Sequence, residues 1–183
     1  MPSEAQRRCP SNDDEAPLPL PPPERLQELL FDAARLGRSD VIPALLQAGA
    51  EMTALDASGH TALILACYHG HDAASALLLA LGASVDQGDG QRGNTALMGA
   101  AFKGYTAVAE RLLEAGAALD AVNHAGQTAL MFAALFGHAP IVDALIGRGA
   151  DPDLVDAAGN SAISVARAQG NDLMVARLTA RQR

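Results

Sequence analysis

The sequence contains few aromatic side chains and almost no lysine. Only 3% of its 183 residues are aromatic, Trp is absent, and Lys103 is the one Lys among 13 basic residues. The hydrophobic share is nevertheless 49%, and it consists mainly of Ala, Leu, Val and Ile. Such a chain is long enough to bury a core as one domain, and its small side chains suit helices that pack closely together.

Further absences exclude whole classes of protein. No run of 18 apolar residues predicts a membrane-spanning helix, and the N-terminus lacks the apolar segment of a secretory signal. Two cysteines, Cys9 and Cys67, provide no disulfide framework, so we expect a cytoplasmic protein. The net charge of −8 argues against nucleic acids and anionic membrane surfaces as partners.

The chain repeats itself at a fixed period. Thr-Ala-Leu or a close variant begins at Thr61, Thr95, Thr128 and Ser161, at spacings of 34, 33 and 33 residues. The same period separates single glycines and Gly-Ala pairs, at Gly37, Gly70, Gly104, Gly137 and Gly170, and at Gly49, Gly82, Gly116 and Gly149. A period of about 33 with one turn and two helices predicts a solenoid.

The most regular unit covers residues 127–150. Apolar spacing predicts one helix over 128–136, which Gly137 ends, and a second over 139–147, which stops before Gly149. Helices of two or three turns are unstable alone in water, because nucleation is costly. Each pair therefore needs its neighbours.

This unit resembles the ankyrin repeat. The resemblance is carried by Thr-Ala-Leu-Met at 128–131, Ala-Ala at 133–134, Gly-His at 137–138 and Gly-Ala-Asp at 149–151. It implies an all-α solenoid of helix-turn-helix pairs with projecting hairpin fingers. We expect five repeats, the outer two acting as caps, at about 25–56, 57–89, 90–122, 123–155 and 156–183.

Residues 1–24 differ in composition from the rest. They hold seven of the ten prolines with acidic and polar residues between them, which predicts a solvated, disordered or polyproline II leader. Pro19 to Pro22 matches the PxxP pattern of proline-recognition ligands, although a plain leader is the simpler interpretation. Cys9 would be an exposed free thiol there.

Local signals predict how the helices begin and end. The Thr before each regular first helix is placed to cap it, and Ser39 or Asp40 is expected to cap the second helix of repeat one, with Pro43 in its first turn. The first helix of that repeat should bury a stripe of apolar residues: Leu26, Leu29, Leu30, Ala33 and Ala34. In the last repeat, Arg167 and Thr179 replace apolar residues, as expected of a C-terminal cap.

The turns that form the fingers open on Asp or Asn and close on Gly. The expected turns are 56–59, 91–93, 123–126 and 156–159. Gly88 and Gly90 precede the second of these turns and form, with its Gly93, a G-x-G-x-x-G order. No strand precedes this pattern and Asp89 lies inside it, so we interpret it as a finger with one inserted residue rather than a nucleotide site.

No catalytic, cofactor or metal site is predicted. His69, His71 and Asp72 lie close together in the sequence, but a zinc site needs more convergent ligands, and the resemblance makes His71 and His138 packing residues between repeats. Cys67 aligns with Ala34, Ala101 and Ala134, which predicts core packing.

The resemblance places the two residues before each repeat glycine on the concave face, and the finger tips beside them. Three of the six aromatic residues occur at these pairs, and aromatic side chains are frequent in binding hot spots, although partial packing between repeats is the alternative. The expected partner-binding residues are Arg35, Leu36, His60, Tyr68, His69, Arg92, Asn94, Phe102, Lys103, His124, Gln127, Leu135 and Phe136.

The expected function is non-catalytic binding of another protein by a monomer. Net charge and many finger-side Asp residues favour a basic partner. Three alternatives remain open. The Thr-Ala-Leu-Met variant is similar to that of small bacterial ankyrin proteins encoded beside catalases, which implies an accessory role for an oxidative-stress enzyme. The second alternative is a secreted effector that binds a host protein. The third is an enzyme, for which no motif in the sequence gives support.

Overall fold

The computed structural model describes residues 20–180, which fold into helical pairs joined by long loops. Within this part of the chain the helices are α1 (Pro23–Leu36), α2 (Ile42–Gln47), α3 (Ala62–Tyr68), α4 (Asp72–Ala80), α5 (Ala96–Lys103), α6 (Thr106–Glu114), α7 (Ala129–Leu135), α8 (Ala139–Arg148), α9 (Ala162–Ala168) and α10 (Asp172–Thr179).

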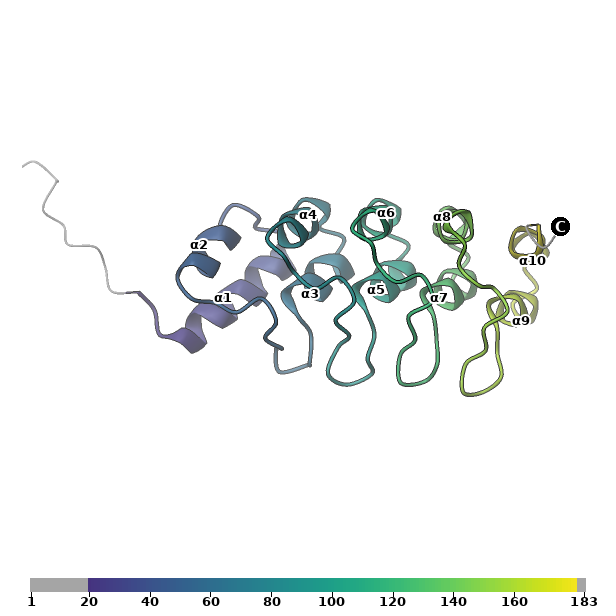
Figure 1. Ribbon diagram of the computed structural model, residues 1–183, viewed down its shortest axis with the longest axis horizontal. Coiled ribbons are helices and arrows are strands. Elements are labelled where there is room, and N and C mark those ends of the chain that lie inside the picture. The colour runs from purple at the N-terminus through teal and green to yellow at the C-terminus, as the bar shows by residue number, and fades with distance from the viewer. Residues whose placement is uncertain (1–19, 181–183) are drawn as a thin grey trace, which may run out of the picture.

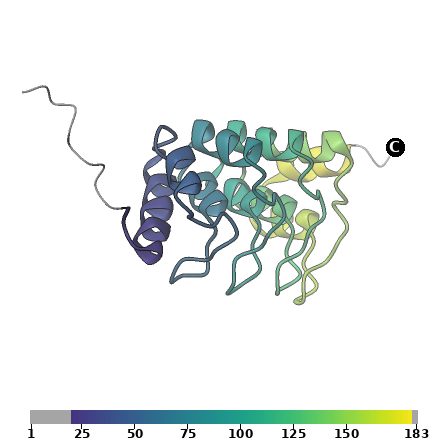
Figure 2. The ribbon, with the colours of Figure 1, turned by 60° about the vertical axis from the view of Figure 1, so that its left-hand side comes forward.

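The pairs stack side by side along one axis. The odd-numbered helices form an inner row, the even-numbered helices form a second row, and the loops project from the stack as parallel fingers (Figures 1 and 2). Extensive helix contacts join only members of one pair or of adjacent pairs. The predicted all-α repeat solenoid is confirmed.

The predicted threonine caps are present in the structure. The hydroxyl oxygens of Thr61, Thr95 and Thr128 accept hydrogen bonds from the backbone N–H three residues on, at 3.2, 3.4 and 3.3 Å. Ser161 makes the same contact at 3.2 Å in the last repeat. Each cap satisfies an amide that the helix itself leaves unpaired.

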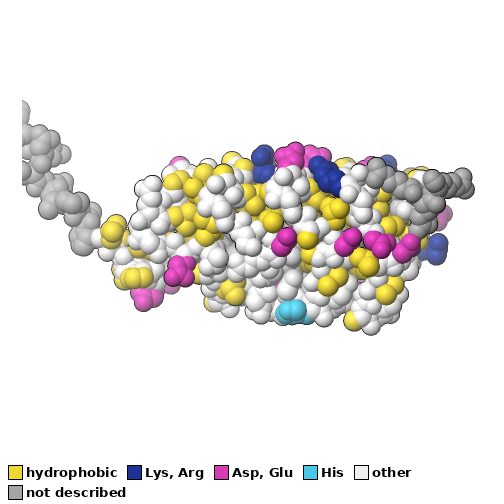
Figure 3. All heavy atoms as spheres, in the orientation of Figure 1, with side chains coloured by type: hydrophobic (Ala, Val, Ile, Leu, Met, Phe, Trp, Pro, Cys, Tyr) yellow, Lys and Arg dark blue, Asp and Glu magenta, His cyan; other side chains and the backbone are white. Residues whose placement is uncertain are grey.

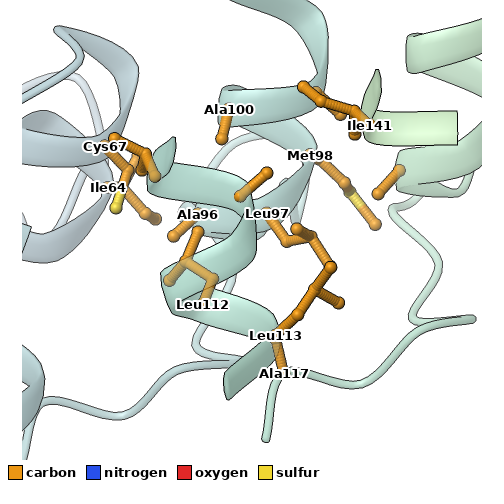
Figure 4. Close-up of a cluster of buried hydrophobic side chains, with 14 of the residues drawn as sticks. Ile64, Cys67, Ala96, Leu97, Met98, Ala100, Leu112, Leu113, Ala117 and Ile141 are labelled. Carbon is orange, nitrogen blue, oxygen red and sulfur yellow. The ribbon is translucent and has the colours of Figure 1, made fainter. Parts of the chain in front are cut away.

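Small side chains let the inner helices pack closely. Ala66, Ala100 and Ala133 are fully buried where adjacent inner helices meet. Larger side chains fill the space between the two rows, and Figure 4 shows Leu112 and Leu113 of α6 close to Leu97 of α5. The core is therefore continuous from repeat to repeat, as nearest-neighbour stacking requires.

Two predicted packing residues connect neighbouring repeats. The Nε2 of His71 donates to the carbonyl of Arg35 at 2.8 Å, and the Nε2 of His138 donates to that of Phe102 at 3.2 Å. Cys67 is fully buried, as predicted. Burial raises the pKa of its thiol to about 12, so the thiolate, which is the nucleophilic form, is scarce there at neutral pH.

The first repeat corrects one prediction and refines another. Neither Ser39 nor Asp40 caps α2: the helix starts after Val41, with no side-chain cap, because the Asp40 carboxylate pairs with Arg38 at 2.8 Å. Pro43 does lie in the first turn. In α1 the buried stripe includes Phe31, whereas Leu29 is only half-buried.

The last repeat ends the stack with polar groups. Arg167 is exposed where the equivalent Ala134 is buried, and the Thr179 hydroxyl donates to the carbonyl of Val175 at 2.9 Å. These features agree with the predicted C-terminal cap. None of the helices within residues 20–180 has the length and apolar character needed to cross a bilayer.

At the N-terminal side, α1 begins at Pro23, inside the expected leader. Cys9 and Pro19, the first residue of the PxxP match, lie outside the described residues.

The finger tips are connected by a ladder of backbone hydrogen bonds. Gly90 N–H donates to Gly59 at 2.8 Å, His124 N–H donates to Arg92 at 2.8 Å, and Ala157 N–H donates to Ala125 at 2.9 Å. One such bond joins each finger tip to the next, so neighbouring fingers are held side by side.

Candidate partner-binding groove

Three of the predicted binding residues form a row of aromatic rings. Tyr68 ends α3, Phe102 lies in the last turn of α5, and Phe136 follows α7. The rings of Tyr68 and Phe102 stack with centroids 6.3 Å apart, and Phe102 meets Phe136 edge-on at 4.7 Å. Their exposed fractions of 39%, 37% and 46% leave much of each ring free. The rings thus pack together and still present apolar surface, and their role in binding stays a prediction.

Lys103 covers one part of this row. Its Nζ lies 4.4 Å from the centroid of the Tyr68 ring and 5.6 Å from that of Phe102. An ammonium held over an aromatic face is stabilised by the ring quadrupole. The cation is thereby kept on the concave side, at the end of α5.

The space between the inner helices and the fingers is hollowed into two adjoining depressions. The first, of about 430 Å³, is lined by six of the predicted residues: Arg35, His60, Tyr68, His69, Arg92 and Asn94. The second, of about 200 Å³, shares four of these and adds Phe102 and Gln127. A shallower hollow at the next finger includes His124. Together these depressions form a groove from α3 to α7.

Four predicted residues do not line this groove. Leu36 is 70% exposed at the end of α1, and Leu135, Lys103 and Phe136 lie beyond the hollows at the helix ends. Lys103 and Phe136 still reach the groove wall through Tyr68 and Phe102.

The floor of the groove consists of residues that sequence reasoning missed. They lie about one turn before the predicted pairs on the same helix face: Ile64, Leu65, Met98, Gly99 and Phe132. The helical spacing could have indicated these positions, because residues four apart on a helix lie on the same face. Ile64 and Met98 stand four residues before Tyr68 and Phe102.

Charges at the first depression are partly neutralised. Arg35 contacts the nearly buried Asp56 carboxylate at 2.5 Å, and the backbone N–H groups of Ser58 and His60 donate to the same carboxylate. Burial opposes ionisation, but these donors and Arg35 lower the pKa of Asp56. His69 is nearby, and burial, followed by the positive fields of His71, Lys103 and Arg35, lowers its pKa.

Asp89 holds together the second finger, between α4 and α5, and corrects the turn predicted at 91–93. Its carboxylate accepts hydrogen bonds from the backbone N–H groups of Gln91, Arg92, Gly93 and Asn94. Asp89, not Gln91, therefore opens this turn, and the inserted residue lengthens the loop that it closes. A Cβ on Gly88 would lie 2.8 Å from the carbonyl oxygen of Gly93. The tight finger explains this glycine, so it gives no support to a phosphate site.

The Asp89 network predicts a pH-dependent contribution to stability. Burial alone would raise the pKa of Asp89, but the hydrogen bonds from backbone N–H groups outweigh this effect and lower the pKa. Asp89→Ala leaves those donors unpaired, so at pH 7 we expect the free energy of unfolding to fall by about 2 kcal/mol. Because the pKa of Asp89 is lower in the folded state than in the unfolded state, the ionised carboxylate stabilises the fold at pH values above the unfolded-state pKa. This contribution is lost as the pH falls through the folded-state pKa. The difference from wild type should therefore shrink below about pH 4.

Urea unfolding at pH 7 and pH 3 measures this difference. Glu110→Ala, on the exposed side of α6, is the control and should change stability by less than about 0.5 kcal/mol. If Asp89→Ala lowers the free energy of unfolding by the same amount at both pH values, the ionised carboxylate is not the source of the stabilisation.

Most finger-side Asp residues that favoured a basic partner already bond to backbone amides. Besides Asp56 and Asp89, Asp86 accepts from Ala118, Asp120 accepts from Asp151, and Asp156 accepts within its own turn. Asp86, Asp120 and Asp151 are exposed and line none of the depressions. Figure 3 shows acidic side chains in a row across one face of the molecule. The negative charge is thus concentrated outside the groove.

The described residues contain no group of three or more His, Cys, Asp or Glu side chains placed to hold a metal ion. His71, which the sequence places close to His69 and Asp72, forms a hydrogen bond with the carbonyl of Arg35.

Comparison with known proteins identifies the repeats. A family model described as "Ankyrin repeats (3 copies)" matches residues 30–123, and one described as "Ankyrin repeats (many copies)" matches residues 112–166. The search of curated proteins gave no match. The first model alone covers more than half of the 183 residues, and the stacked helix pairs and fingers have the architecture that the resemblance implied. The chain therefore belongs to the ankyrin-repeat family.

Proposed function

We propose that this protein is a non-catalytic module that binds a partner protein in the groove between the inner helices and the fingers. Ankyrin repeats generally bind other proteins. The observation that carries the proposal is the row of half-exposed rings: Tyr68 and Phe102 line the groove, and Phe136 continues the row by packing against Phe102. Exposed apolar surface of this kind marks interaction sites on folded domains.

The net charge and the row of exposed Asp residues bear on the class of partner. A charge of −8 disfavours nucleic acids and anionic membranes, and a basic surface would meet Asp86, Asp120 and Asp151 rather than the groove. We propose a monomer, because polar residues close the C-terminal end of the stack. We also propose a cytoplasmic location, because the two cysteines provide no disulfide framework. An accessory role for an oxidative-stress enzyme and an effector role would use the same groove, and they differ in the identity of its occupant.

Removal of two rings tests the proposal. The variant Phe102→Ser, Phe136→Ser is expected to bind the captured partner about 30-fold more weakly, or about 2 kcal/mol, the scale of a binding hot spot. The two rings touch each other, so their effects will not simply add. Affinity purification from the source cells identifies the partner, and biolayer interferometry with both purified proteins gives the ratio of dissociation constants.

Leu173→Ser provides the matched control. Leu173 is the most exposed large hydrophobic residue of the described chain, and it lies in the last helix, outside the groove. It should leave binding unchanged, and far-UV circular dichroism should show both variants helical. Full binding by the double variant would move the site away from the groove.

A further inference from the structure

Gly99 is the unusual residue of the groove. In the regular inner helices the equivalent positions carry large side chains, Leu65 in α3 and Phe132 in α7. Gly99 lies in the interior of α5, where glycine is the least favourable residue after proline. The stability of the helix therefore argues against glycine at this position.

Neither the backbone nor the packing requires a glycine there. Gly99 is not among the residues with positive φ, so any L-residue could adopt its conformation. A Cβ at this position would meet only the Cδ2 of Tyr68, at an ordinary van der Waals distance of 3.6 Å. The main effect of Gly99 is to leave space between its neighbours.

That space is the smaller depression of the groove. It has a volume of about 200 Å³, and its apolar wall consists of Ile64, Tyr68, Met98, Phe102 and Phe132 around Gly99. Small-molecule sites usually measure roughly 300 to 1,000 Å³, so this hollow is small for such a ligand. It suits one large apolar side chain.

Positive charge borders the hollow on two sides. Arg92 lines it from the finger, and Lys103 lies over Tyr68, which is its wall on the helix side. Both cations are exposed, and neither forms an ion pair with any residue within 20–180. Asp89 also lines the hollow, but it is buried and bound to four backbone amides.

The local charge therefore differs in sign from the net charge. Burial is the main cause of the lowered pKa of the nearby His69, and the charges of His71, Lys103 and Arg35 lower it further. The exposed carboxylates of Asp86, Asp120 and Asp151 do not line the hollow, whereas Arg92 lines it and Lys103 lies over its Tyr68 wall.

We propose that the hollow over Gly99 receives one large apolar side chain from an acidic segment of the partner protein, and that carboxylates flanking this side chain bind Arg92 and Lys103. The assignment rests on the proposed function, because it specifies the partner of the same groove. An apolar anchor with charge-assisted contacts on either side explains both the missing side chain at Gly99 and the unpaired cations.

Two substitutions at one position test the hollow. Gly99→Ala adds a methyl group for which there is room and should retain binding, with a higher thermal unfolding midpoint because Ala favours the helix. Gly99→Leu fills the hollow with the side chain found in α3. The probe is a random twelve-residue peptide library displayed on phage and selected on the immobilised full-length chain.

The selected peptides should share one large apolar residue flanked by Asp or Glu. Synthetic copies, measured by fluorescence anisotropy, should bind Gly99→Leu at least 10-fold more weakly than wild type and Gly99→Ala within about 2-fold. Arg92→Gln, Lys103→Gln should weaken binding about 10-fold and reduce its salt dependence. Enrichment of basic peptides, failure to enrich any sequence, or equal binding to Gly99→Leu would overturn the proposal.

Other occupants of the hollow give distinct results. If Asp13→Asn, Asp14→Asn, Glu15→Gln in the full chain tightens peptide binding, the chain's own acidic segment is the occupant and the proposal is overturned. Self-association abolished by Gly99→Leu in sedimentation experiments would overturn it in favour of a second copy. If Gly99→Leu still captures the cellular partner while the double Phe variant does not, this inference fails and the proposed function stands.

Discussion

Leu130→Ala is expected to lower the free energy of unfolding by about 3 to 4 kcal/mol. Leu130 lies in α7 and is fully buried, and α7 packs against both α5 and α9. With a helix on each side, the cavity left by the lost atoms cannot easily collapse, so a cavity penalty is added to the lost burial. Urea unfolding followed by far-UV circular dichroism measures the change.

Leu36→Ala is the matched control for this prediction. The same chemical change at a side chain that is 70% exposed should cost less than about 0.5 kcal/mol. A loss below about 1 kcal/mol for Leu130→Ala would show that the central repeats are more loosely packed than the structure indicates.

Gly104→Ala is expected to cost about 3 kcal/mol, from two sources. Gly104 has a φ of 79°, which disfavours any residue with a Cβ. Its Cβ would also lie 2.5 Å from the Cε1 of His138. The His138 ring would have to move away and lose its bond to the carbonyl of Phe102. Thermal and urea unfolding of the purified variant measure the cost.

Two further variants separate the two sources. Gly116 has a similar φ of 85° and nothing within 4 Å of its Cβ position, so Gly116→Ala should cost only the backbone strain, about 1 kcal/mol. Once His138→Ala has removed the ring, the added cost of Gly104→Ala should fall to that same value. An unchanged cost would refute the steric explanation.

Periodicity made the fold predictable from the sequence. The spacing of Thr61, Thr95 and Thr128 gave the repeat length, and their hydroxyls do cap the three helices. A signal repeated several times is robust, because each copy must satisfy the same local geometry. Capping of α2 was mispredicted because the helix begins only after Val41 and the Asp40 carboxylate pairs with Arg38, a contact that no periodicity indicates.

The groove was predictable only in part. Aromatic residues at equivalent positions indicated the ring row, and Tyr68, Phe102 and Phe136 do touch in sequence order. The floor at Gly99 was missed, because an absent side chain gives no signal until its neighbours are placed around it. The role of Asp89 was missed because the inserted residue shifted the second turn relative to the others.

Net charge was an incomplete guide for a related reason. It counts every carboxylate equally, whereas the structure separates the nearly buried carboxylates of Asp56 and Asp89 from those exposed on the outer face, such as Asp86 and Asp120. Cations such as Lys103 remain exposed beside the groove. The distribution of charge, and not its sum, decides which surface a partner meets.

Stacking by nearest neighbours has a consequence for how this molecule responds to a ligand. The helices of repeat two have extensive contacts only with those of repeats one and three, so a disturbance in α3 can reach α7 only through the repeat between them. A ligand lying along the groove would touch α3, α5 and α7 at once. Such a ligand would couple three repeats directly, and these repeats would unfold as one longer cooperative unit when the groove is occupied.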